Sequence, residues 1–430
     1  VMGQQTVAAT ALTLKDRNGS LVGSSVPFST LSRDPKRSLR DLMIQAFGSA
    51  WFMLRMMGRL LWAMRASVSW TFLVFRLLVY VMLLLPAFLQ ATAHCWLHPS
   101  VENNVRYGPK RRHLVDVYKL RPGWRSGEAR PVVVFMTGGV WIIGYKMWGF
   151  LMGMLMQRLG ILFIAPDYRN FPQVTASDMV EDTVAAVQWC IDNCAAYGGD
   201  PNRIFLVGQS AGAHLLAQAL LQKCVEGPKA KHSWQPQDVR AYVGISGPFD
   251  LLGLAEHFHT RGLDRRVLSS IFEAKLAAFS PTSTAKAWLE QRRKMEEAHE
   301  PLPASKLPPV LLVHGTGDVS VPAENAVELA EALQAAGART VGLKLYEGKS
   351  HTDPIIEDPM SGDDPLIEDL AYLVLSSCAT KAVKELGMSG RHDGPKTELD
   401  LKKKELFPLP VGRQMLPLRL INLARKVTPF

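Results

Sequence analysis

The stretch that decides the fold class is IFLVGQSAGAHLLAQALL, residues 204–221. An apolar run typical of a strand, IFLV, is followed by GQSAG at residues 208–212 and then by a helix-forming run. Glycines on both sides of the central tripeptide permit a cramped turn between strand and helix, which holds a serine hydroxyl clear of a sheet. The stretch therefore predicts a nucleophile elbow with Ser210 as the nucleophile.

Short β-branched runs alternate with amphipathic stretches of helical length on both sides of the elbow. The expected strands are Val132–Met136, Leu162–Ala165, Ile204–Val207, Tyr242–Ile245, Val310–His314 and Leu343–Tyr346. The expected helices are Asp178–Ala196, Ala211–Cys224, Ala323–Ala336 and Pro365–Ser377. This alternation is typical of a mostly parallel sheet covered by helices, so we expect an α/β fold of the α/β-hydrolase class.

A second glycine-rich turn precedes the elbow, because the apolar strand VVVFM ends in TGGVW at residues 137–141. An attacked ester develops an alkoxide, which is stabilised by rigid N–H donors already aimed at it. We expect the backbone amides of Gly138, Gly139 and Ala211, the residue after the nucleophile, to form this oxyanion hole. The alternative for residues 137–141 is an ordinary turn at the end of a strand.

In this architecture the acid and the base of the triad follow the serine in chain order. We expect the acid at Asp318, in the turn that ends PPVLLVHGTGD, where a carboxylate can orient an imidazole. We expect the base at His351, which follows LKLYEGKS and can take the proton from Ser210. The competing acids, Asp250 and Asp353, occupy less suitable positions.

The other histidines have simpler explanations. His314 lies at a strand end and is expected to be structural, and His214 lies one helical turn beyond Ser210 and is expected to pack within its helix. His257 and His259 fit a cap lining or an exposed surface equally well. Hydrolysis by a triad needs no metal or organic cofactor, and the sequence contains no HExxH, EF-hand or P-loop pattern.

The N-terminal part of the chain predicts membrane association. Residues 1–40 are expected to be a disordered tail, and residues 41–98 a membrane-anchoring helical region. Within that region Leu77–Trp96 carries no Asp, Glu, Lys or Arg over about the length that crosses a bilayer, although a re-entrant or interfacial segment remains an alternative. The stretch at residues 46–66 contains three arginines and fits an amphipathic interfacial helix or a second crossing.

The catalytic domain is expected at residues 99–378, with a charged helical insert at about 249–305. We interpret the insert as a cap over the site, while a solvated surface insertion fits its composition equally well. Residues 379–430 are expected to form a basic C-terminal tail that is disordered by default, and its basic and apolar end alternatively fits a peripheral membrane or docking segment.

Composition supports an enzyme with a membrane partner. The chain has 430 residues, a hydrophobic fraction of 47% and a formal net charge of +10, and many basic residues flank the apolar N-terminal region. This distribution favours a membrane surface over nucleic acid, for which no fold signature is present. The five cysteines lack the spacing of a zinc site or a disulfide framework, so a reducing compartment is expected.

Several motifs between residues 107 and 377 resemble those of the isoprenylcysteine α-carbonyl methylesterases. They are TGGVWIIGYK, DYRNFPQ, SDMVED, YGGDPNRI, GQSAGAH, HFHTRGLD, HGTGD and GKSHTD. Larger relatives, such as kynurenine formamidases and hormone-sensitive-lipase-like esterases, carry His at the first position of the HGG turn. This chain has Thr137 there, which favours the methylesterase branch.

The resemblance implies the same triad and oxyanion donors, and it implies a substrate. The family hydrolyses the carboxyl methyl ester of farnesylated or geranylgeranylated cysteine, so the expected partners are prenylated cysteine methyl esters or prenylated protein C-termini, together with membrane lipid. We expect an endoplasmic reticulum or Golgi membrane location with the catalytic domain in the cytosol; the oligomeric state is left open. The rival hypotheses are a membrane-bound carboxylesterase, lipase or arylformamidase with this triad, and a non-catalytic membrane interaction protein on a hydrolase scaffold.

Overall fold

A computed structural model describes residues 51, 55, 58, 68–120, 129–226, 233–261, 264–301, 305–388, 399, 402–403, 412 and 414–428. The expected tail at residues 1–40 and nearly all of the stretch at 46–66 lie outside the described residues. Every element described below belongs to the structural unit formed by residues 52–430.

The described strands form one 8-stranded sheet in the order β1-β2-β4-β3-β5-β6-β7-β8. They are β1 Val101–Arg106, β2 Leu114–Tyr118, β3 Arg130–Met136, β4 Leu162–Pro166, β5 Gly199–Gln209, β6 Val239–Ile245, β7 Val310–Gly315 and β8 Val341–Tyr346. The pairs β1–β2 and β2–β4 are antiparallel, and all the other pairs are parallel. The six expected strands and the mostly parallel α/β fold are confirmed, and β1 and β2 extend the sheet at one edge.

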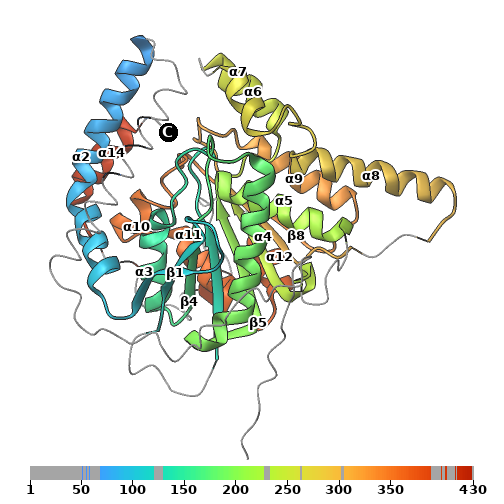
Figure 1. The fold of residues 1–430 in the computed structure, drawn as a ribbon, viewed down its shortest axis with the longest axis horizontal. Helices are drawn as coiled ribbons and strands as arrows, with labels where there is room; N and C mark the ends of the chain where they lie inside the picture. The colour runs from blue at the N-terminus through green and yellow to red at the C-terminus, as the bar shows by residue number, and fades with distance from the viewer. Residues whose placement is uncertain are drawn as a thin grey trace, which may run out of the picture. The chain divides into compact units, whose positions relative to one another are not determined.

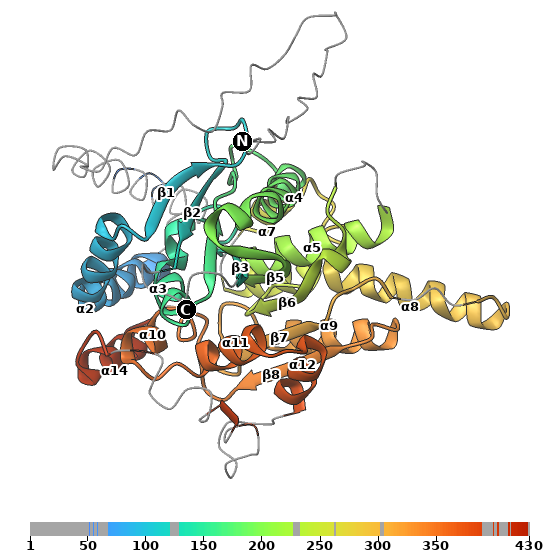
Figure 2. The ribbon, with the colours of Figure 1, turned by 90° about the horizontal axis from the view of Figure 1, so that it is seen from below.

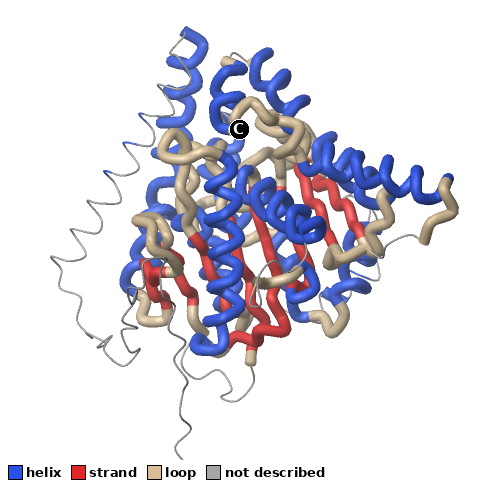
Figure 3. Tube along the Cα trace, turned by 45° about the vertical axis from the view of Figure 1, so that its right-hand side comes forward, coloured by secondary structure: helices blue, strands red, loops and turns tan. Residues whose placement is uncertain are grey.

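Helices cover both faces of this sheet, as the strand and helix layers show (Figures 2 and 3). The four expected helices are confirmed as α4 Ala176–Asn193, α5 Ala211–Glu226, α9 Glu324–Ala335 and α11 Pro365–Leu375. Alternate residues of β3 enter two separate cores: Val132 and Val134 pack with α4 and α5, whereas Val133 packs with α3 (Phe150–Arg158) and α11. This division follows from the two-residue period of a strand.

The insert expected at residues 249–305 is helical, as expected. It contains α6 Leu251–Thr260, α7 Arg265–Ile271 and α8 Pro281–Glu297, and α8 packs against α9. In Figure 1, α6 and α7 lie together near one end of the sheet, and α8 extends away from them. Its role as a cap remains a prediction.

Helix α2, Val68–Leu97, contains the expected apolar segment. Among the described residues it is the one helix that is long and apolar enough, at Phe75–Leu97, to cross a membrane, and only 22% of its most apolar window is buried. One face packs on α3 and β1 through the buried residues Tyr80, Leu84, Ala87, Ala91 and Cys95. The other face exposes the apolar residues Phe75, Leu78, Met82, Leu89 and Leu97.

The C-terminal part of the chain differs from the expected tail. Helix α12, Ala379–Met388, packs against β8 and buries Val383 and Leu386, and α14, Leu418–Val427, packs against α2 and buries Ile421 and Ala424. Both helices place small and branched apolar residues on one face, which is the pattern of a helix docked on a core. The described parts of residues 379–430 therefore belong to the folded unit.

Candidate active site

Ser210 stands between the end of β5 and the first residue of α5. Its φ of +53° lies in the left-handed region, and its backbone N–H donates to the carbonyl oxygen of Ile245 on β6 at 2.8 Å. A non-glycine residue rarely adopts this φ, so the neighbouring backbone must hold it. The two flanking glycines are needed for space, because a Cβ on Gly208 would lie 2.6 Å from the Ala213 backbone and one on Gly212 would lie 2.1 Å from the Met136 carbonyl oxygen.

The glycine turn after β3 lies directly against the elbow. A Cβ on Gly138 would lie 2.7 Å from the Ser210 Cβ, so the two backbones could not approach this closely with any other residue at position 138. Gly139 has a φ of +127°, and a Cβ there would lie 2.5 Å from the Gly144 amide nitrogen. The structure therefore brings Gly138 close to Ser210, and Ala211, the first residue of α5, follows Ser210 in the chain. The Ala211 N–H belongs to the first helical turn and has no acceptor within the helix.

Asp318 and His351 form a close pair from two different loops. The Oδ2 atom of Asp318 lies 2.6 Å from Nδ1 of His351. The other carboxylate oxygen, Oδ1, accepts hydrogen bonds from the backbone N–H groups of Ser320 and Val321, each at 2.9 Å. Both side chains are almost fully buried. This geometry fixes the imidazole orientation and leaves Nε2 as the ring nitrogen that faces away from Asp318.

Glycines in the turn after β7 make that pair possible. A Cβ on Gly315 would lie 2.1 Å from the Lys349 carbonyl oxygen, and one on Gly317 would lie 2.8 Å from that of Gly348. The Gly317 N–H also donates to the Lys349 carbonyl oxygen at 3.0 Å. The HGTGD motif is therefore glycine-rich because the loop that carries His351 packs backbone against backbone on the turn that carries Asp318.

The environment of Asp318 keeps it ionised. Burial opposes the charge, but the charge of His351 and hydrogen bonds from His314 and His351 together lower the pKa of Asp318 well below its ordinary value. The His314 Nε2 atom lies 3.3 Å from Asp318 Oδ2 and also donates to the Val321 carbonyl oxygen at 2.9 Å. His314, expected to be structural, therefore also contacts the acid.

Gln209 is a residue of the site that the sequence reasoning missed. Its side-chain nitrogen lies 3.4 Å from Nε2 of His351, so the free edge of the imidazole faces the residue next to Ser210. The structure thus brings Asp318, His351 and the elbow together at the carboxyl ends of the strands. Gln209 occupies a variable position of the G-x-S-x-G pattern, so its side chain carried no signal in the sequence.

The remaining candidates lie apart from the pair. His214 contacts the rings of Trp141 and Phe272 and donates to a backbone carbonyl at 2.7 Å, and burial lowers its pKa to about 4, as suits a neutral packing residue. Asp250 caps the N-terminus of α6. Asp353 forms an ion pair with Arg425 at 2.8 Å.

His257 and His259 lie on α6 in the insert. His257 contacts the Val319 carbonyl oxygen at 3.0 Å, one residue beyond Asp318, and His259 is exposed. Within the described ranges, no three His, Cys, Asp or Glu side chains gather in the way that a metal site requires.

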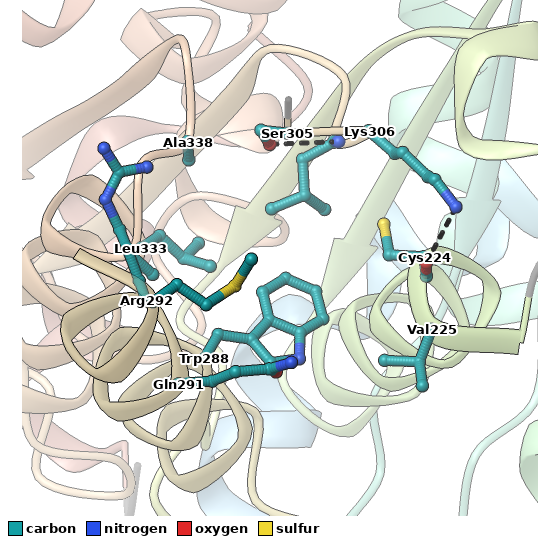
Figure 4. A pocket seen from close by; sticks show the side chains of 12 residues that line it. Cys224, Val225, Trp288, Gln291, Arg292, Ser305, Lys306, Leu333 and Ala338 are labelled. Atoms are coloured by element: carbon teal, nitrogen blue, oxygen red, sulfur yellow. Dashed lines mark hydrogen bonds between the residues drawn. The ribbon is translucent and has the colours of Figure 1, made fainter. Parts of the chain in front are cut away.

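A pocket of about 320 Å³ lies at the far end of α5, away from the elbow (Figure 4). Trp288 and Arg292 of α8 and Cys224 and Val225 of α5 are among the residues that line it. Burial raises the pKa of the Cys224 thiol to about 12, so this cysteine is a thiol at neutral pH and a poor nucleophile. The pocket therefore offers none of the reacting groups found at the elbow.

A mostly parallel sheet with helices on both faces, a strained serine between strand and helix, and an Asp–His pair at the same sheet edge define an α/β-hydrolase. The comparison with protein-family models agrees with this class. The family model BD-FAE matches residues 115–333. The apo form of Thermogutta terrifontis esterase 2 covers 69% of this chain and 97% of its own at 24% identity, with a TM-score of 0.49.

Curated relatives define the family more closely. Isoprenylcysteine alpha-carbonyl methylesterase ICME of Arabidopsis thaliana is 38% identical over 376 residues, 86% of this chain and 80% of that protein. The probable isoprenylcysteine alpha-carbonyl methylesterase ICME of Oryza sativa subsp. japonica is 35% identical over 94% of this chain and 92% of its own length. Esterase LipQ of Mycobacterium tuberculosis is 30% identical over 58% of this chain and 56% of its own length. The chain belongs to the isoprenylcysteine α-carbonyl methylesterase family and is a carboxylic ester hydrolase.

Proposed function

We propose that this protein hydrolyses the carboxyl methyl ester of farnesylated or geranylgeranylated cysteine and releases methanol, through an acyl-enzyme on Ser210. The observation that carries the proposal is the 2.6 Å contact between His351 and Asp318 beside a strained Ser210. The substrate class is supported by the names of the two methylesterase relatives, which match most of this chain.

In the first half of the reaction Ser210 Oγ attacks the ester carbonyl carbon, and His351 Nε2 takes the hydroxyl proton. Asp318 holds Nδ1–H and stabilises the imidazolium that forms. The carbonyl oxygen becomes an oxyanion, for which the N–H groups of Gly138, Gly139 and Ala211 are the donors. The tetrahedral intermediate collapses when the imidazolium gives its proton to the methoxide, and methanol leaves.

In the second half a water molecule takes the place of methanol. His351 removes a proton from this water as the oxygen attacks the acyl carbon, and the same backbone donors stabilise the second oxyanion. Proton return to Ser210 Oγ breaks the acyl bond and releases the free carboxylic acid. His351 takes part in every proton transfer, and water is the second substrate.

The exposed face of α2 supports association with a membrane. Five large apolar side chains face outward on this helix while its opposite face packs on the catalytic domain. A helix held in this way can meet lipid along its outward face, which favours the interfacial alternative over an independent crossing. Prenyl chains partition into membranes, so a lipid-bound enzyme would share a surface with its substrate. We propose the endoplasmic reticulum or Golgi membrane as that surface, with the catalytic domain in the cytosol.

The substrate is tested by comparing turnover of farnesylcysteine methyl ester, a short-chain p-nitrophenyl ester and N-formylkynurenine. The proposal predicts the highest kcat/KM on the prenylcysteine ester, with equimolar methanol. A preference for N-formylkynurenine would instead identify an arylformamidase, and a preference for the p-nitrophenyl ester a general carboxylesterase or lipase.

The catalytic role of Ser210 is tested with Ser210→Ala and a fluorophosphonate probe. The variant should lose activity and labelling while its melting temperature stays close to that of the wild type, because the hydroxyl makes no contact that the fold needs. Activity close to wild type would refute the role of Ser210. A wild-type protein that neither turns over an ester nor takes the label would identify a non-catalytic interaction protein.

A further inference from the structure

The base loop, residues 347–356, carries His351 between β8 and α10, Glu357–Ser361. No strand or helix includes the loop, so no regular backbone ladder fixes the imidazole. One side of the loop rests on the Asp318 turn, as described above. The side of the loop that faces away from the Asp318 turn is held by side-chain contacts with neighbouring helices.

Helix α14 holds the loop through Arg425. The Nε atom of Arg425 donates to Asp353 Oδ1 at 2.8 Å, and Nη2 donates to Asp358 Oδ1 at 2.6 Å. Asp353 in turn accepts the backbone N–H of Ser350 at 2.8 Å through its other oxygen. A chain of two polar contacts therefore connects α14 to the residue before His351.

Helix α2 holds the loop through Tyr80. The Tyr80 hydroxyl donates to Glu357 Oε1 at 2.8 Å, and the Thr352 hydroxyl donates to the same oxygen at 3.0 Å. All three side chains are buried. The residue after His351 is therefore connected to α2 by two hydrogen bonds.

The two helices also hold each other. Arg76 of α2 donates to the Val427 carbonyl oxygen at the end of α14 at 3.1 Å, and the helices pack side by side (Figures 1 and 2). On α14 the buried residues Ile421 and Ala424 alternate with the exposed Leu418 and Leu423. The helices that present apolar side chains outward are thus the ones that reach the two neighbours of His351, α14 through Asp353 and α2 through Glu357.

We propose that α2 and α14 form a clamp on the base loop, in which Arg425 and Tyr80 are positioning residues that hold His351 in reach of Ser210. The inference rests on the proposed triad and adds residues from two distant segments to it. It does not depend on the identity of the ester.

The charges explain why Arg425 matters. Asp353 and Asp358 are almost fully buried, and Arg425 contacts both, while Lys349 contacts Asp358 at 2.7 Å. Removal of Arg425 leaves Asp353 without its ion pair and beside a second carboxylate, and like charges at low exposure repel each other. The loop can relieve this repulsion by moving toward solvent, which would carry the imidazole away from Ser210. A displacement of about 1 Å can cost up to about a hundredfold in rate.

The experiment compares Arg425→Ala with Arg419→Ala in the full chain. Arg419 is an exposed arginine on the same helix, so its removal changes the charge of α14 equally without touching the loop. The measurements are kcat and KM on a soluble p-nitrophenyl ester, the rate of fluorophosphonate labelling, and the melting temperature. We expect Arg425→Ala to lower kcat and the labelling rate about tenfold or more with little change in KM, Arg425→Lys to recover part of the loss, and Arg419→Ala to match wild type.

Tyr80→Phe provides a second variant in case Arg425→Ala does not fold. It removes one hydroxyl and keeps the ring, and it should lower kcat about threefold to tenfold, as expected for the loss of one buried hydrogen bond. If Arg425→Ala folds and keeps the kcat and labelling rate of the wild type, the clamp is overturned. If only Tyr80→Phe folds, the same result for Tyr80→Phe overturns it. A lower melting temperature with unchanged kcat would also overturn it, because the contacts would then be purely structural.

These readouts separate the clamp from the proposed substrate. Labelling and p-nitrophenyl turnover require Ser210 and His351 but no prenyl group. If prenylcysteine esters are not cleaved while labelling still depends on Arg425, the substrate assignment fails and the clamp stands. If labelling and turnover of the soluble ester do not depend on Arg425 while prenylcysteine esters are cleaved, the clamp fails and the substrate assignment stands.

Discussion

Replacing Asp318 with Asn tests the proposed acid and base together. The carboxylate has two distinct oxygens: Oδ1 accepts two backbone N–H groups, and Oδ2 faces His351 Nδ1. An Asn at this position must place its carbonyl oxygen where the two N–H groups point, because an NH₂ group there would face two donors. The NH₂ group then faces Nδ1 of His351 and makes that nitrogen the acceptor.

This inversion fixes the imidazole in the wrong tautomer. With Nδ1 accepting, the proton sits on Nε2, which can no longer take the proton of Ser210. The charge that stabilises the imidazolium is lost as well. Together these losses predict a decrease in kcat of about 10³- to 10⁴-fold, which corresponds to about 4–5.5 kcal/mol of transition-state stabilisation.

The assay is kcat on the soluble p-nitrophenyl ester, with labelling by the fluorophosphonate probe as a second measure. Asp250→Asn is the matched control, because Asp250 is one of the two competing acids and its side chain caps α6. The control should lose some stability, about 1 kcal/mol or less, and keep its kcat. A kcat of Asp318→Asn within tenfold of the wild-type kcat would refute the assignment of Asp318 as the acid. A loss of kcat in Asp250→Asn as large as the one predicted for Asp318→Asn would indicate that Asp250 is the acid.

Two further predictions concern Glu357 and the exposed face of α2. Burial, and next the charge of Asp353, raise the pKa of Glu357 from 4.5 to about 7. The folded protein therefore keeps a proton between these values that the unfolded chain releases, so stability should fall as the pH rises from 4.5 to about 7 and then level off. Glu357→Gln cannot ionise and should flatten this part of a plot of melting temperature against pH; parallel plots would contradict the shift. Leu78→Gln with Met82→Gln should lower binding to phosphatidylcholine vesicles by about tenfold or more, because each buried side chain contributes about 1.5–3 kcal/mol. Leu252→Gln, an exposed leucine on α6, is the control, and equal binding by all variants would exclude α2 as the lipid contact.

The sequence predicted the parts of the site that are encoded locally. The elbow depends on a strand, a pentapeptide and a helix within 18 consecutive residues. Both glycines of that pentapeptide are needed because neighbouring backbone atoms lie too close to leave room for a Cβ. Asp318 and His351 follow from the order of elements in this class of fold, and the structure places them 2.6 Å apart. Their catalytic roles remain predictions, which the experiments above address.

The parts that were missed depend on segments far apart in the chain. Strand β1, with the sequence VENNVR, has polar residues at its centre and lies at an edge of the sheet, so it lacks the apolar run that marks a central strand. Tyr80 and Glu357 are separated by 277 residues, and Arg425 and Asp353 by 72. A contact of this kind leaves no periodic pattern in either segment. The basic, apolar segment that contains Arg425 was therefore interpreted by composition, as a tail, although part of it docks on the folded unit.

The clamp gives the outward apolar faces of α2 and α14 a consequence for catalysis. Leu418 and Leu423 are exposed on the helix that carries Arg425, and Leu78 and Met82 are exposed on the helix that carries Tyr80. Lipid that binds these side chains more tightly when the two helices are packed would stabilise the packed arrangement, because a ligand favours the state that it binds best. The same arrangement is the one that holds both neighbours of His351. If the proposed lipid contact and the proposed clamp both hold, lipid contact and the position of His351 are linked equilibria, and we expect a variant that loosens the base loop from α14 to weaken vesicle binding as well.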